Sequence, residues 1–73
     1  MTYIATVSTF AEAIAAGEFT SLKAAKEWAR ANVTDHASVV VADASFSTRY
    51  IKLSKLNNKS VWTGDAPKSW FNA

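Results

Sequence analysis

The chain has 73 residues, no cysteine, an apolar fraction of 49% and a formal net charge of +2. The apolar fraction is too high for a disordered chain, and the missing cysteines exclude disulfides and thiolate metal sites. The mild positive charge permits an acidic partner without demanding one. Residues 1–8 lack the basic-then-apolar order of a signal peptide, and no apolar run approaches the roughly 18 residues of a membrane span. We therefore expect a single domain over residues 1–73, with no membrane segment and a cytoplasmic location.

The first two segments predict strands, the second less clearly than the first. Residues 2–8 are rich in β-branched and aromatic side chains that roughly alternate, as is typical of a strand. Residues 11–19 fit two structures. Thr9 followed by Glu12 is a capping-box pattern that favours a helix, but a helix ending at Gly17 would run directly into the next one. Loose alternation late in this segment favours a strand that pairs with the first, and the helix stays open as the alternative.

The clearest pattern is an amphipathic helix within residues 19–33. Its apolar residues recur at the three- and four-residue spacing of an α-helix. Either Thr20 or Ser21 can cap its start, because a hydroxyl there accepts from the free N–H groups of the first turn. Phe19 can pack forward as a staple. The apolar side comprises Leu22, Ala25, Trp28, Ala29 and Val33, and the opposite side comprises Lys23, Lys26, Glu27 and Arg30.

Three further strands are expected after the helix. Residues 38–43 form a continuous β-branched run, which suits a strand inside a sheet. Residues 46–54 and 59–63 follow as a second and a returning strand. Turns are expected at residues 43–45 and at Asn57-Asn58, where two positive-φ positions suit a tight hairpin.

The C-terminal tail is expected to fold back on the body of the protein. Residues 64–67 contain the glycine and proline that break the sheet. Trp70 and Phe71 follow, and two large aromatic side chains on a frayed end would be costly in water. Trp28 and Trp62 are expected in the core. The predicted fold is α+β, with one amphipathic helix on one face of an antiparallel sheet of four to five strands, in the order strand-strand-helix-strand-strand-strand. The opposite face must be polar, carry a partner or pair with another copy.

The sequence predicts no enzyme and no cofactor or metal. His36 is the one histidine, and a solvated loop position explains it better than general-base catalysis, which needs a partner to hold the ring. The carboxylates lack the spacing of a metal loop or of an acid/base pair. Gly17 and Gly64 are the only glycines, so no phosphate-binding glycine loop exists.

Two basic clusters are the candidate binding residues. On the helix, Lys23, Lys26 and Arg30 share one side, which is interrupted by Glu27. They form either an ordinary solvated face or a positive ridge for an acidic protein or for phosphates.

The second cluster surrounds the predicted hairpin. Basic side chains beside an aromatic residue on a sheet face can hold a single nucleic-acid strand by charge and stacking. Lysines on exposed strands also guard against edge-to-edge aggregation, so both interpretations remain open. The members of this cluster are Arg49, Tyr50, Lys52, Lys55 and Lys59.

The runs FTSLKAAKEWA (19–29), VVVAD (39–43) and TRYIKLSKLNNKSVW (48–62) resemble a small-protein architecture of phages and prophages. Within that set the chain is similar to one of the small type I-F anti-CRISPR proteins, which has two strands, a helix and three further strands. The match depends on helix-start and core residues, so it specifies fold better than activity. These residues are Ser21, Leu22, Ala25, Lys26, Ala29, Lys59 and Trp62.

The resemblance implies a non-enzymatic phage inhibitor that occupies the surface of a host CRISPR-like nucleoprotein complex. Only Lys26 and Lys59 match basic positions of that pattern. Direct nucleic-acid binding through the hairpin cluster is the alternative, and self-association through the uncovered sheet face is a third. We expect a monomer or a weak homodimer in the host cytoplasm.

Overall fold

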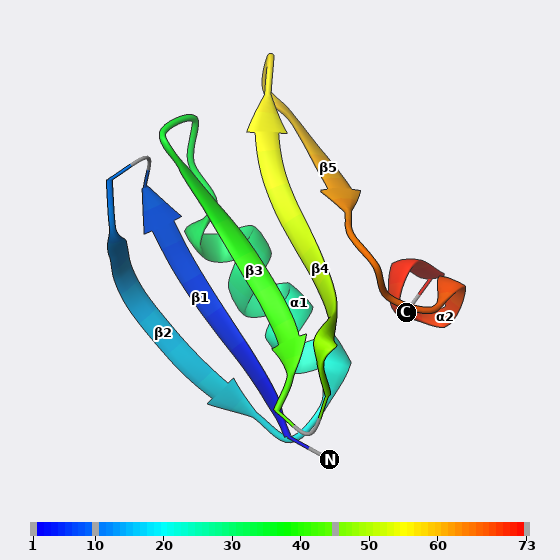
Figure 1. Cartoon of the computed structure of the whole chain (residues 1–73). Helices are drawn as coiled ribbons and strands as arrows, with labels where there is room; N and C mark the ends of the chain where they lie inside the picture. The colour runs from blue at the N-terminus through cyan, green and yellow to red at the C-terminus, as the bar shows by residue number, and fades with distance from the viewer. Residues whose placement is uncertain (1, 10, 45, 73) are drawn as a thin grey trace.

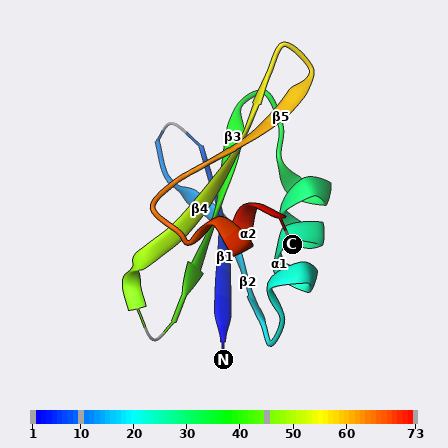
Figure 2. The same cartoon turned by 90° about the vertical axis from the view of Figure 1, so that its right-hand side faces the viewer.

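The computed structural model describes residues 2–9, 11–44 and 46–72. The elements are β1 (Tyr3–Thr9), β2 (Ala13–Phe19), α1 (Leu22–Asn32), β3 (Ala37–Asp43), β4 (Phe46–Leu56), β5 (Lys59–Thr63) and α2 (Lys68–Asn72). The strands form one antiparallel sheet in the order β2-β1-β3-β4-β5. Helix α1 covers one face of this sheet, and in the described residues no helix covers the other (Figure 1, Figure 2). The predicted α+β fold and its order of strands and helix are confirmed, and α2 is an addition.

The ambiguous segment after β1 is a strand, β2. The Thr9 hydroxyl accepts from the backbone N–H groups of Ala11 and Glu12, both at 3.3 Å, and the Thr9 N–H donates to the Glu12 carbonyl at 2.8 Å. The Thr-to-Glu spacing that resembles a helix cap therefore closes a hairpin turn. The helical alternative is wrong because the backbone of β2 is instead paired with β1 along its length.

Local capping sets both ends of α1. The Ser21 hydroxyl accepts from the Ala24 N–H at 3.1 Å, which confirms one of the two predicted caps. At the other end Val33 is extended, while its N–H still donates to the Ala29 carbonyl at 2.9 Å. Ala25 and Ala29 are fully buried, so their small side chains bring the helix backbone close to the sheet.

The core lies between α1 and the sheet and is built from alternate residues of the central strands. Val39 and Val41 in β3 are fully buried, and so are their cross-strand partners Leu53 and Ile51 in β4. Burying one such side chain contributes about 1.5–3 kcal/mol. This row therefore determines which residues of β3 and β4 face α1, and the residues between them must face the other way.

The β4–β5 hairpin confirms the predicted turn. Asn57 and Asn58 have φ values of 52° and 66°, as a tight hairpin turn with two positive-φ positions requires. β4 runs to Leu56, past its predicted end, so the hairpin projects beyond the start of β3 (Figure 1). The predicted turn at 43–45 ends at Ser45, which lies outside the described residues.

The C-terminal tail folds back, as predicted, in the form of the short helix α2. Trp70 is only 6% exposed, and its ring meets the Tyr3 ring edge-on at 5.4 Å between centroids. Phe71 packs against the core cluster. The Trp70 N–H donates to the Pro67 carbonyl at 2.9 Å, so the first turn of α2 begins at the proline that was predicted to break the sheet.

Candidate functional site

Strand register determines which side chains line the helix-free face of the sheet. Val40 in β3 pairs with Thr6 in β1 and with Lys52 in β4, and Lys52 pairs with Thr63 in β5. Because side chains alternate along a strand and Val39 faces α1, this whole row faces away from the helix. The helix-free face therefore carries a lysine among β-branched residues near its centre.

Two of the hairpin lysines share this face with an aromatic residue. Lys52 is exposed, and Tyr50, two positions earlier on the same side, is half-buried. Lys59 is exposed and lies opposite Leu56, which stands an even number of positions from Lys52. Register thus gathers Lys52, Lys59 and Tyr50, three of the five residues of the predicted hairpin cluster, on one surface.

The other two basic residues of the predicted hairpin cluster point the opposite way. Strand alternation turns Lys55 and Arg49 toward the helix side of β4. Lys55 is half-buried at the rim near the α1–β3 connection, whereas Arg49 is exposed. The cluster is therefore divided between two faces, and Lys52 and Lys59 are its members on the helix-free side.

The positive ridge predicted on α1 is not continuous. Lys23 and Arg30 are exposed, but Lys26 is only 1% exposed. Its Nζ donates to the Trp70 carbonyl oxygen at 2.8 Å and lies 5.2 Å from the centroid of the Trp62 ring. Lys26 is thus unavailable to a partner in this fold, contrary to its predicted surface position. A helical wheel predicts which side of α1 packs on the sheet. It does not show that β5 and α2, which come later in the chain, pack over the side of the helix that carries Lys26.

The surroundings of Lys26 are those of a structural cation. Burial lowers the pKa of its ammonium below the usual 10.5, and the nearby positive charge of Arg30 lowers the pKa further. The Arg30 guanidinium carbon also lies 5.9 Å from the Trp62 centroid, so two cations share one indole. The hydrogen bond and the cation–π contacts offset part of the desolvation cost. Lys26 therefore joins α1 to β5 and α2.

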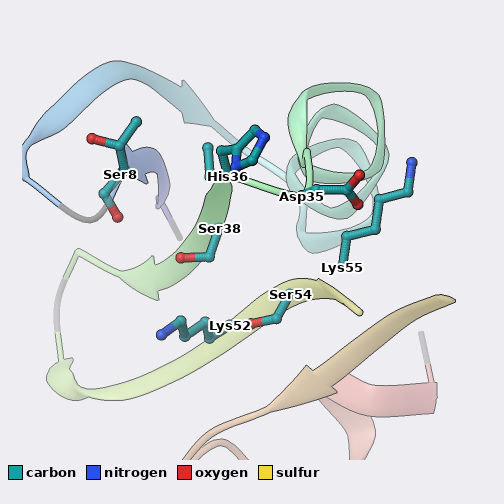
Figure 3. Close-up of a pocket in the computed structure, with 9 residues that line it drawn as sticks. Ser8, Asp35, His36, Ser38, Lys52, Ser54 and Lys55 are labelled. Carbon is teal, nitrogen blue, oxygen red and sulfur yellow. The ribbon is translucent and has the colours of Figure 1, made fainter. Parts of the chain in front are cut away.

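A hollow of about 360 Å³ lies where the projecting hairpin passes the start of β3. Its walls come from the ends of β1, β3 and β4 and from the loop that follows α1 (Figure 3). We call this hollow the serine notch. The notch is lined by Ser8, Thr9, Asp35, His36, Ala37, Ser38, Lys52, Ser54 and Lys55.

Sequence reasoning missed the serine notch. Ser8 pairs with Ser38, and Ser54 follows Leu53, whose partner is Val39, so register places the three serines in one row across three strands. The sequence signal was only a serine at an outward position near the relevant end of each strand. His36, predicted as a solvated loop residue, is exposed and lines the same hollow.

Apolar side chains stand among the polar ones on the helix-free face. Leu56 is 68% exposed and Val61 is 47% exposed, both on the β4–β5 hairpin, while Ile4 on β1 is 39% exposed. Pairing of Val61 with Ser54 and of Ile4 with Ala42 assigns them to this face. The face therefore offers apolar contact beside its positive charge.

Neither a metal site nor a membrane-spanning helix is found in the part of the chain that the structure describes. There, no three histidine, aspartate or glutamate side chains gather closely enough to hold a metal ion. Over the same residues, no helix has the length and apolar character needed to cross a bilayer. Comparison of the chain with protein-family models, curated proteins and solved structures found no match.

Proposed function

We propose that this chain is a non-enzymatic binding protein that contacts the nucleic acid of a host nucleoprotein complex through the helix-free face of its β4–β5 hairpin. The observation that carries the proposal is the shared face of Lys52 and Lys59, with Tyr50 beside them and no covering helix in the described residues. Ammonium groups neutralise backbone phosphates, and an aromatic ring gives a base a surface to stack on.

The apolar residues on the same face support a single strand over a duplex. Leu56 and Val61 are exposed beside the lysines and can contact the faces of unpaired bases or their sugars. In a duplex those base faces are stacked on one another and out of reach. Engagement of Lys52 and Lys59, the two cluster lysines on this face, gives a slope of log affinity against log salt of about −1.4, at about −0.7 per phosphate of a single strand.

The direct test is fluorescence anisotropy of a labelled single strand of about ten nucleotides, comparable to the site of one small binding domain. The Lys52→Glu/Lys59→Glu variant is expected to lose measurable affinity at low salt. The matched control is Lys23→Glu/Lys68→Glu, which reverses two exposed lysines away from the helix-free face of the hairpin and should lower affinity only modestly. Equal losses in both variants, or affinity independent of salt, would remove the proposal.

A narrower function, inhibition of a host CRISPR-like complex by a phage protein in the host cytoplasm, is supported by the resemblance of the helix-start and hairpin residues alone. Of the two basic positions in that resemblance, only Lys59 is exposed. Affinity capture with the tagged chain from a host lysate tests this function. It predicts a stoichiometric nucleoprotein partner whose recovery falls in Lys59→Glu but not in Lys68→Glu, and capture of no such complex would contradict it.

A further inference from the structure

We infer that the serine notch binds a phosphate ester, of the size of the sugar-phosphate unit of one nucleotide. This inference deepens the proposed function and rests on it, because it names the point on β4 where a phosphate of the bound strand is held. The notch shares Lys52 with the open hairpin face but adds the hydroxyl groups of Ser8, Ser38 and Ser54, so the serines allow a separate test.

The notch offers neutral donors in a row. Ser8 and Ser38 are directly paired, which places their Cβ atoms about 4.5–5.5 Å apart. Ser54 extends the row into β4, and its hydroxyl lies on the same side as that of Ser38 (Figure 3). Hydroxyl groups rotate to suit a ligand and commonly donate to phosphate oxygens. A tetrahedral anion can accept from several such donors at once.

The charged side chains that line the notch also favour an anion at the serine row. The Lys52 side chain extends on the side of the Ser38 and Ser54 hydroxyls, whereas Lys55 extends to the other side, toward Asp35 (Figure 3). In the view of Figure 3, the Asp35 carboxylate lies on the side of Lys55 and away from the hydroxyls of Ser38 and Ser54. An anion on the serine row meets the Lys52 ammonium without facing that carboxylate.

The wall of the notch is held in place before any ligand arrives. The Thr34 N–H donates to the Ala37 carbonyl at 3.1 Å, and the Ala37 N–H donates back to the Thr34 carbonyl at 3.3 Å. The His36 N–H donates to the Thr34 hydroxyl at 3.2 Å, which leaves the imidazole at the rim. A preformed wall lowers the ordering cost of binding.

The volume of the notch is compatible with a small ligand. Small-molecule sites usually have volumes of about 300–1,000 Å³. At about 360 Å³ the notch is at the lower end of that range. A bare phosphate ion would leave much of it filled with water, whereas a phosphate with its sugar would occupy it more fully.

The test is an NMR titration of the full chain at low salt, followed at its backbone amides. Cytidine monophosphate is expected to give saturable shifts at Ser8, Ser38 and Ser54, inorganic phosphate weaker ones, and cytidine none. Lys52→Gln should weaken cytidine monophosphate at least about tenfold, as expected for loss of a charged donor. Ser38→Ala/Ser54→Ala should weaken it several-fold, and Lys68→Gln, with the same charge change on α2, should leave it unchanged.

The inference is overturned if cytidine monophosphate gives no saturable shift at the three serines. It is also overturned if cytidine shifts them equally, or if Lys52→Gln and Lys68→Gln behave alike. A dinucleoside monophosphate, whose phosphate is a diester, distinguishes a strand phosphate from a free nucleotide. Oligonucleotide affinity without cytidine monophosphate binding would contradict phosphate binding in the notch and leave the proposed function standing. Cytidine monophosphate binding without oligonucleotide affinity would contradict the proposed function and leave phosphate binding in the notch standing.

Discussion

The lysines of α1 and those of the β4–β5 hairpin look alike in sequence and have opposite environments. Lys26 is 1% exposed beneath Trp62 and next to Trp70, while Lys52 and Lys59 stand exposed on a face that no described helix covers. All three belong to the basic clusters that the sequence predicts. The role of a lysine therefore depends on what packs over it, which its spacing in the sequence does not reveal.

The difference has a local physical cause in the small residues of α1. Ala25 and Ala29 bring the helix close to the sheet, and the flank beside them is filled by the methylene stem of Lys26. Trp62 and Trp70 then close over the ammonium group. On the helix-free face the described residues supply no such cover, so the lysines there keep their hydration.

The most destabilising substitution is expected at Gly64, which directly follows β5 and passes close to the backbone of β4. Gly64 has φ of 138°, and a Cβ there would collide with the Tyr50 backbone carbonyl and lie 3.0 Å from the Ile51 Cα. Gly64→Ala should lower the free energy of unfolding by about 3 kcal/mol, because neither backbone strain nor a backbone clash is easily relieved. Denaturant unfolding measures this loss.

Gly17→Ala is the matched control for this substitution. Its Cβ would meet the Phe19 ring at 2.9 Å, and a ring at the end of a side chain can move aside. Gly17 also lies within β2, where alanine reduces the entropy of the unfolded chain, so the change should stay within about 1 kcal/mol. Similar losses at the two glycines would show that the path of the chain at Gly64 is not a special constraint.

The next prediction compares the loss of stability on replacing the buried Lys26 with the loss on replacing the exposed Lys52. Lys26→Ala should cost about 2 kcal/mol, since it removes a buried stem and leaves the Trp70 carbonyl without its ammonium donor. Lys26→Met keeps most of the volume and should cost about 1 kcal/mol. Lys52→Met should stay within about 0.5 kcal/mol. Equal stability of Lys26→Met and Lys52→Met in urea titrations would contradict the structural role of Lys26.

The smallest expected effect is a dependence of stability on pH. The pKa of Lys26 is lowered in the folded state, by burial first and by Arg30 second, so the unfolded chain binds this proton more tightly. Between the lowered pKa and 10.5 the unfolded state holds more protons, and the free energy of unfolding rises with pH in that window. Below the folded pKa the cost of burying the charge is fully present.

The measurement is the difference in unfolding free energy between the parent chain and Lys26→Met, followed across the alkaline range. The difference should shift in favour of the parent chain as the pH approaches 10.5. Subtraction of the variant removes the titration of tyrosines and of the other lysines. A shift in favour of Lys26→Met over this range would mean that the folded state raises the pKa instead.

Much of the fold follows from features that act over a few residues. Ser21 caps α1 as its hydroxyl predicts, and Asn57-Asn58 form the turn that their tolerance of positive φ predicts. The Thr9–Glu12 pattern was informative about local hydrogen bonding but ambiguous about its outcome, because the same hydroxyl contacts can start a helix or close a hairpin. Pairing of β2 with β1 resolved that ambiguity.

The candidate site was less predictable than the fold. Lys52, Lys59 and Tyr50 could be placed together because they lie on one hairpin, within which the alternation of side chains is known once the turn is known. The row of Ser8, Ser38 and Ser54 could not, since its members come from three strands whose alignment depends on long-range register.

The sequence alone predicted the amphipathic helix, the strands and the turns of this protein, because backbone preference and alternation of side chains are local properties. The burial of Lys26 and the assembly of the serine notch were not, because each depends on segments that meet only after the sheet has closed. Burial and strand register are consequences of packing between distant parts of the chain, and one sequence read in order does not contain them.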